Sequence, residues 1–219
     1  MGAYSGLSAY FEQPLCDYAI QFGYDESNIV ILEGDINRLQ ANHIEIYNNL
    51  LSCNHHSDSR TPLQYAQDLV ATWIFEDYFL GKIQNDHFTI SKAGSDRTRI
   101  ILNNSKTSTN SDYIVSTGTK DIPLELVNDY SDFWLRKKAL HLRDNKYLKL
   151  KQSHSLLLAI DLSEYNQKFM LFNFIEDIPA KFLPYHPVWH KPAYELAVNV
   201  DDMMDFSVEN VICEIDKVV

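Results

Sequence analysis

The spacing of apolar residues changes along the chain, and this change predicts both helices and strands. Residues 39–51 and 61–81 carry apolar side chains at intervals of three and four, which is the spacing of one helix face. After residue 87 the apolar runs are short, and they alternate with polar residues or form compact blocks, as strands do. A chain with both kinds of element is expected to fold as an α/β or α+β domain rather than as an all-helical one.

The helix over residues 61–81 has the clearest boundaries. Thr61 can cap it, Pro62 suits its first position, and Gln64 completes a capping-box pattern, while Gly81 is placed to end it. Glu76 falls near the apolar face of this helix. A carboxylate at that position needs a partner, which a metal ion or a lysine would supply, unless the side chain reaches water at the helix border.

Strand predictions come from short apolar runs bounded by polar turns. Residues 1–38 read as irregular, with one strand-like run at residues 28–32. Further along, the prolines at 184, 187 and 192 exclude a long helix near the C-terminus. The other predicted strands are the pair HFTI and RIIL, read as a hairpin, then SDYIVS, IPLELV, LLLAID, KFMLFNF and the late run YELAVNV.

Length and composition favour a single domain over residues 1–219, because the chain can bury one substantial core and contains no repeat or convincing linker. The three cysteines are odd in number and far apart, which argues against a disulfide framework. No apolar run approaches the length of a membrane span, and no signal-like segment precedes the first helix. We therefore expect a soluble, cytoplasmic protein.

The charge distribution matters more than the net charge of −11. An acidic protein is a poor candidate for binding nucleic acid, since affinity comes largely from cations that neutralise phosphates. However, residues 136–151 hold seven of the 19 Lys and Arg residues and one acid. This segment is either a solvated surface or a phosphate-binding element. Its cations are Arg136, Lys137, Lys138, Arg143, Lys146, Lys149 and Lys151.

Two acidic residues lie on the strands that precede this basic segment. Asp112 is at the start of SDYIVS, where an ordinary turn acid is also common. Glu125 alternates with Leu124 and Leu126, so it shares the opposite strand face with Val127. If both faces of the sheet are covered, the Glu125 carboxylate is buried and requires a cation.

This order of elements resembles the PD-(D/E)xK nuclease superfamily, to which many restriction endonucleases belong. The resemblance covers residues 61–175, with 1–60 as an N-terminal region and 176–219 as a C-terminal extension. It implies an α/β fold with a restriction endonuclease-like mixed central sheet flanked by helices, plus an extra C-terminal strand or hairpin. It also implies that Asp112 and Glu125 hold Mg²⁺, or Mn²⁺ in its place, and that Glu76 is an auxiliary ligand.

The chain departs from the family at one position. Val127 stands two residues after Glu125, where the family has its lysine. Related nucleases take this lysine from the following helix, and the resemblance then points to Lys146 ahead of Lys138. Arg143, Lys146 and Lys149 recur every third residue, which suits one face of a helix.

The function implied is a metal-dependent endonuclease, of restriction type, that hydrolyses phosphodiester bonds of double-stranded DNA. A homodimer would cut both strands most simply. The alternative is a catalytically degenerate nuclease fold that serves as a nucleic-acid or protein binding module. In either case the residues expected to contact the substrate backbone are Arg136, Lys137, Arg143, Lys149 and Lys151.

Two other groups of residues offer ligands for zinc. One is the cluster at residues 53–56, which contains a cysteine and two histidines, and the other is the pair His186 and His190. The spacing is weak in both, and we interpret them as loop or packing residues. No nucleophile elbow, Walker loop or dinucleotide fingerprint is present in the sequence.

Overall fold

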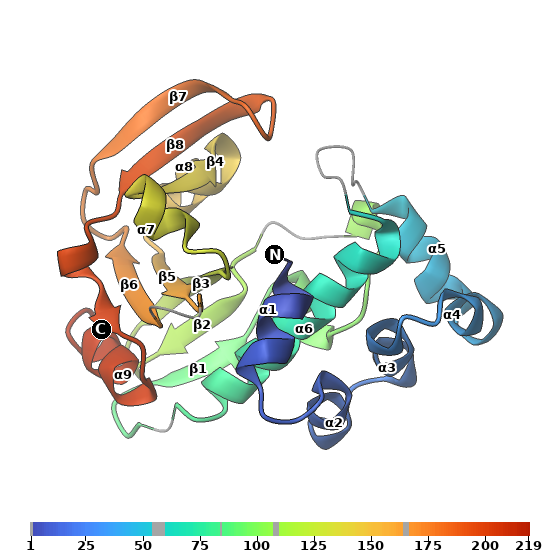
Figure 1. Cartoon of the computed structure of the whole chain (residues 1–219). Coiled ribbons are helices and arrows are strands. Elements are labelled where there is room, and N and C mark those ends of the chain that lie inside the picture. The colour runs from blue at the N-terminus through green and yellow to red at the C-terminus, as the bar shows by residue number, and fades with distance from the viewer. Residues whose placement is uncertain (1, 54–59, 84, 107–109, 164–166) are drawn as a thin grey trace. The chain divides into compact units, whose positions relative to one another are not determined.

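The computed structural model describes residues 2–53, 60–83, 85–106, 110–163 and 167–219. The fold is mixed α/β, as predicted, with an N-terminal helical region followed by two sheets (Figure 1). Contacts divide the chain into two compact units. One, the helical unit, comprises Met1–Lys82 and Ala93–Asn110, and the other, the sheet unit, comprises Ile83–Lys92 and Ser111–Val219. The expectation of a single domain stays a prediction.

Helix α6 is the centre of the helical unit, and α1, α2, α3 and α5 all pack against it. The capping box that the sequence predicted at Thr61 and Gln64 is present. Its apolar side chains are buried, among them Trp73 and Phe75. The helices of this unit are α1 (Ala3–Tyr10), α2 (Leu15–Gln21), α3 (Glu26–Glu33), α4 (Ile36–Asn42), α5 (Ile44–Ser52) and α6 (Pro62–Leu80), with the 3₁₀ turns η1 (Ser95–Thr98) and η2 (Asn104–Lys106).

Four secondary-structure predictions for this unit were wrong. Residues 1–38 are not irregular but contain α1, α2, α3 and the start of α4. The run at residues 28–32 is helical, because Asp25 caps α3 at Ser27 and Gly34 ends it in the left-handed conformation. The helix expected over residues 39–51 is broken at His43 into α4 and α5. The RIIL run forms no strand. Instead, the carbonyl oxygens of Arg99 and Ile101 accept hydrogen bonds from asparagine side chains of the helices.

The main sheet of the sheet unit has six strands in the order β1-β2-β3-β5-β6-β9. The strands β1, β2 and β3 form an antiparallel meander, and β3 is then parallel to β5 through a crossover that contains α7, β4 and α8. The strands are β1 (Thr89–Lys92), β2 (Tyr113–Ser116), β3 (Asp121–Asp129), β5 (Leu156–Asp161), β6 (Lys168–Asn173) and β9 (Met204–Asp205).

A second, three-stranded antiparallel sheet has the order β4-β8-β7, and its β7–β8 pair is the predicted C-terminal hairpin (Figure 1). Helix α8 packs against β4 and β8. An apolar core joins this sheet and α8 to the face of the main sheet that carries Leu157 and Ala159. The remaining elements are α7 (Phe133–Lys137), β4 (Ala139–Arg143), α8 (Asp144–Gln152), β7 (Ala180–His186), β8 (Lys191–Ala197), η3 (Val200–Asp202) and α9 (Val208–Asp216).

The cysteines form no disulfide, in agreement with the expectation from their number and spacing. No helix within the described ranges has both the length and the apolar character needed to cross a membrane.

Candidate active site

Asp112 and Glu125 lie opposite each other on neighbouring strands. In the antiparallel pairing of β2 and β3, Tyr113 is the partner of Leu124. Asp112 directly precedes β2, so one further step in the same register places it across from Glu125. The two carboxyl groups are joined by a side-chain hydrogen bond. The sheet therefore brings together the two acids that the sequence singled out.

Helix α8 adds two lysines to these acids. The Nζ of Lys146 donates to Oε2 of Glu125, and the Nζ of Lys149 lies 3.9 Å from Oε1 of the same carboxylate. Residues three apart share a helix face, which explains why both lysines reach one acceptor. The Glu125 side chain is 1% exposed, whereas those of Lys146 and Lys149 are 33% and 27% exposed. The site thus has a buried acid at its base and cations at its rim.

Burial, together with the neighbouring Glu125, raises the pKa of Asp112 from 3.8 to about 8. Burial is the largest cause, followed by the hydrogen bond to Glu125 and the negative charge of Glu125, while the positive charges of Lys146 and Lys149 oppose the shift. The pKa of Lys149 is lowered, mainly by burial. Two carboxyl groups this close do not both ionise easily, so the pair retains one proton near neutral pH.

This donor set fits a hard divalent cation. Mg²⁺ prefers oxygen ligands, and it is commonly held by one or two carboxylates while it keeps several waters. A cation between Asp112 and Glu125 would replace the proton that the pair otherwise retains. No group of three or more His, Cys, Asp or Glu side chains suited to a metal occurs in the described part of the chain, so the protein ligands here would be these two.

The position of Val127 explains why a lysine does not follow Glu125 on the strand. Val127 lies in β3 beside Ala159 of β5 and packs against the apolar core under α8. A lysine at this position would have to leave its ammonium group among apolar side chains, at a high desolvation cost. The lysine bonded to Glu125 is Lys146 of α8.

Glu76 pairs with an arginine, whereas a metal ion or a lysine was expected as its partner. It belongs to the helical unit, and its Oε2 accepts a hydrogen bond from Nη1 of Arg99 at 3.0 Å. Arg99 also binds Asp77 at 2.6 Å, and all three side chains are less than 10% exposed. The Glu76 carboxylate is therefore charge-compensated by an arginine, without a metal.

The basic segment is spread over α7, β4 and α8 rather than over one helix. Arg136 pairs with Asp132 and Lys151 pairs with Asp177. Lys137 and Lys138 are exposed, at the last position of α7 and at its C-cap. The guanidinium of Arg143 lies 5.5 Å from the ring centroid of Trp189. Of the predicted substrate contacts, Lys149 is the one that adjoins the acids.

His186, one of the second pair of histidines, belongs to a chain of hydrogen bonds that was not predicted from the sequence. His186 Nε2 lies 2.9 Å from Nδ1 of His141, and His141 Nε2 lies 3.2 Å from Oε2 of Glu195. His186 stacks on Trp189, and burial lowers its pKa. His141 and Glu195 are register partners on β4 and β8, which no local pattern reveals. Residues 54–56 of the other histidine cluster lie outside the described residues.

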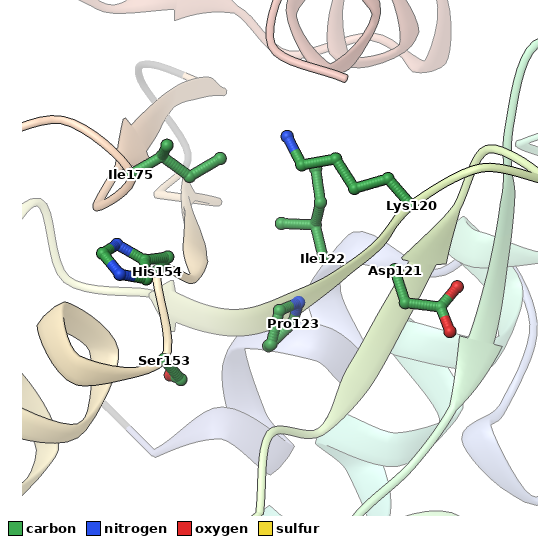
Figure 2. Close-up of a pocket in the computed structure, with 7 residues that line it drawn as sticks. All are labelled: Lys120, Asp121, Ile122, Pro123, Ser153, His154 and Ile175. Carbon is green, nitrogen blue, oxygen red and sulfur yellow. The ribbon is translucent and has the colours of Figure 1, made fainter.

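A cavity of about 440 Å³ opens where β3 begins and α8 ends. Figure 2 shows Lys120 and Ile122 projecting from β3 and its preceding turn, with His154 and Ile175 across from them. Pro123 also lines this cavity, two residues before Glu125. The lining of this cavity combines apolar and charged side chains.

Comparison of the sequence with protein-family models and with curated proteins gave no match.

Proposed function

We propose that this protein is a metal-dependent nuclease, an endonuclease that hydrolyses phosphodiester bonds of DNA. The observation that supports this function best is the group formed by Asp112, Glu125 and Lys146. Two acids held by adjacent strands and a lysine from helix α8 are residue types that can support such hydrolysis.

The order of elements gives further support. A three-stranded antiparallel meander carries both acids, and the chain then crosses over to β5, parallel to β3. This arrangement agrees with the resemblance to PD-(D/E)xK nucleases. Adjacent strands also hold their side chains rigidly, which suits the fixed geometry that a metal site needs.

Each residue has a defined part in the proposed reaction. Asp112 and Glu125 would hold Mg²⁺, which, when bound, lowers the pKa of a coordinated water and neutralises phosphate charge. Lys146 and Lys149, which lie at the Glu125 carboxylate, would donate hydrogen bonds to the phosphate. There they would stabilise the negative charge that develops in the transition state.

The exposed cations would hold the substrate backbone. Lys137 and Lys138 are exposed at the end of α7, and Arg143 is exposed on β4. Phosphate contacts of this kind position a duplex without reading its sequence. A homodimer would place two sites on the two strands of the duplex, as in the family that the chain resembles.

Incubation with plasmid DNA and with RNA tests the proposal directly. The protein should cut DNA in Mg²⁺ or Mn²⁺ and fail to do so in excess chelator. Asp112→Asn should abolish cleavage. Asp121→Asn, which changes an exposed acid at the first position of β3, should not. Metal-independent cleavage, or full activity of the Asp112 variant, would refute the assignment.

One observation favours the alternative of a binding module without catalysis. The Lys146–Glu125 ion pair already compensates the buried carboxylate, and the strand position of the family lysine is Val127. A degenerate site would bind DNA equally well in chelator and in Mg²⁺, and calorimetry would detect no Mg²⁺ binding that depends on Glu125. Salt-sensitive DNA binding without cleavage would support this alternative.

A further inference from the structure

A second pair of acids lies at the carboxyl ends of the parallel strands β3 and β5. Asp129 is the last residue of β3, Asp161 is the last residue of β5, and the two are register partners. Register partners project from the same face of a sheet. Ligands commonly bind at the carboxyl ends of parallel strands, because the following loops leave space there. The pair is independent of the proposed nuclease function.

Asp161 is a buried carboxylate with an unused oxygen. Its side chain is fully buried, and its Oδ1 accepts a hydrogen bond from the backbone of Ser163 at 2.9 Å. Its Oδ2 has no hydrogen-bond partner among the described residues. The hydroxyl of Ser163, a residue that is 6% exposed, has none among them either. A buried carboxylate oxygen without a donor is costly, and a bound cation would remove that cost.

The surroundings add negative charge. Burial is the largest cause of the raised pKa of Asp161, contacts with Ser163 oppose the shift, and the charges of Asp129 and Asp132 raise this pKa further. Asp129 is itself buried, and its two oxygens accept bonds from Ser131 and from the backbone of Trp134. Oδ1 accepts from both the backbone N–H and the hydroxyl of Ser131, whereas Oδ2 accepts one bond and keeps a lone pair for a further partner.

The nearest lysine in the sheet is directed elsewhere. Lys168 is the register partner of Asp161 on β6, but its Nζ binds Oδ1 of Asp205 at 3.0 Å. Asp205 is 87% exposed, so Lys168 pairs with an acid at the surface although a buried one is its direct neighbour. The buried acid pair is thus left without a cation from the described side chains.

We propose that Asp129, Asp161 and the Ser163 hydroxyl form a binding site for a hard divalent cation, separate from the Asp112–Glu125 site. All of these ligands are oxygens, which Ca²⁺ and Mg²⁺ accept and softer metals do not favour. Each pair contributes one acid to β3. Glu125 and Asp129 lie on the same face of this strand, with Val127 between them. The cation would tie the ends of β3 and β5 together.

Calorimetric titration with Ca²⁺ and with Mg²⁺ tests this site in the full-length Glu125→Gln variant, which lacks the first site. We expect one ion to bind, and we expect Asp161→Asn in this background to weaken binding at least tenfold. Ser163→Ala, which keeps both carboxylates, should weaken binding severalfold. Asp121→Asn, at the start of the strand β3 that ends with Asp129, should leave the affinity unchanged.

Two outcomes would overturn the proposal. The first is the absence of ion binding in the Glu125→Gln variant, which would mean that a proton or Lys168 compensates Asp161. The second is an unchanged affinity after Asp161→Asn in a variant whose circular dichroism shows the native fold. Failure of the proposed nuclease would instead appear as absent DNA cleavage while ion binding at Asp161 persists.

Discussion

Replacement of Asp112 by Asn removes a titratable group from the acid pair with little change in volume. In the metal-free protein, the pKa of Asp112 is about 8, whereas its ordinary value is 3.8. Between these two pH values the native state holds a proton that the unfolded state has released. Stability therefore falls as the pH rises through this window, and the fall ends above the folded-state pKa.

The magnitude follows from the proton count. One extra proton in the native state changes the free energy of unfolding by about 1.4 kcal/mol per pH unit. Between pH 5 and pH 7 the wild-type protein should lose roughly 3 kcal/mol from this group, and the Asn variant should lose none of it. Other groups titrate in the same range, so the quantity to compare is the difference between the two proteins at each pH.

Urea unfolding in chelator at pH 5, 6 and 7 measures this difference. The variant should gain stability relative to the wild type with each step in pH, and Asp121→Asn should show no such trend. With saturating Mg²⁺ the trend should shrink, because the cation displaces the proton from the wild-type pair. A stability difference that does not change with pH would refute the electrostatic description of the pair.

Three other substitutions test separate parts of the structure. In single-turnover assays, Lys146→Met should lower the cleavage rate at least 100-fold, because Lys146 is the lysine bonded to Glu125, and Lys149→Met should lower it less. Equal and small decreases in rate for the two variants would contradict the assignment. Glu76→Gln should destabilise the fold by about 1.5–3 kcal/mol in urea, because it removes one of the two carboxylates that bind the buried Arg99, and Mg²⁺ affinity should not change. Thr61→Ala should cost about 1 kcal/mol by loss of the α6 cap, measured as a lower melting temperature.

Local patterns were sufficient for the strands that build the candidate site. The block LLLAID matches β5, because a fully buried strand is apolar along its whole length. The alternation placed Glu125 on the face opposite Leu124 and Leu126, with burial expected if both faces of the sheet were covered, and its carboxylate is buried. In contrast, the run at residues 28–32 has strand-like composition, but its caps and its packing on α6 make it helical. Tertiary contacts decided that case.

Features that depend on register between distant strands could not be predicted from the sequence. Asp129 and Asp161 become neighbours through the crossover between β3 and β5, and His141 meets Glu195 across the second sheet. None of these pairs is close in the chain. The choice between Lys146 and Lys138 was also open in the sequence, and in the structure Lys146, on α8, is the one bonded to Glu125.

The most direct test of the nuclease proposal is the rate at which purified protein nicks or linearises supercoiled plasmid in Mg²⁺, compared with the rate for Glu125→Gln. We expect metal-dependent cleavage by the wild type and a loss of at least 100-fold in the variant, because Glu125 would hold the metal at the base of the site. Equal rates for the two proteins, or no cleavage by either protein in Mg²⁺ or Mn²⁺, would contradict the proposal.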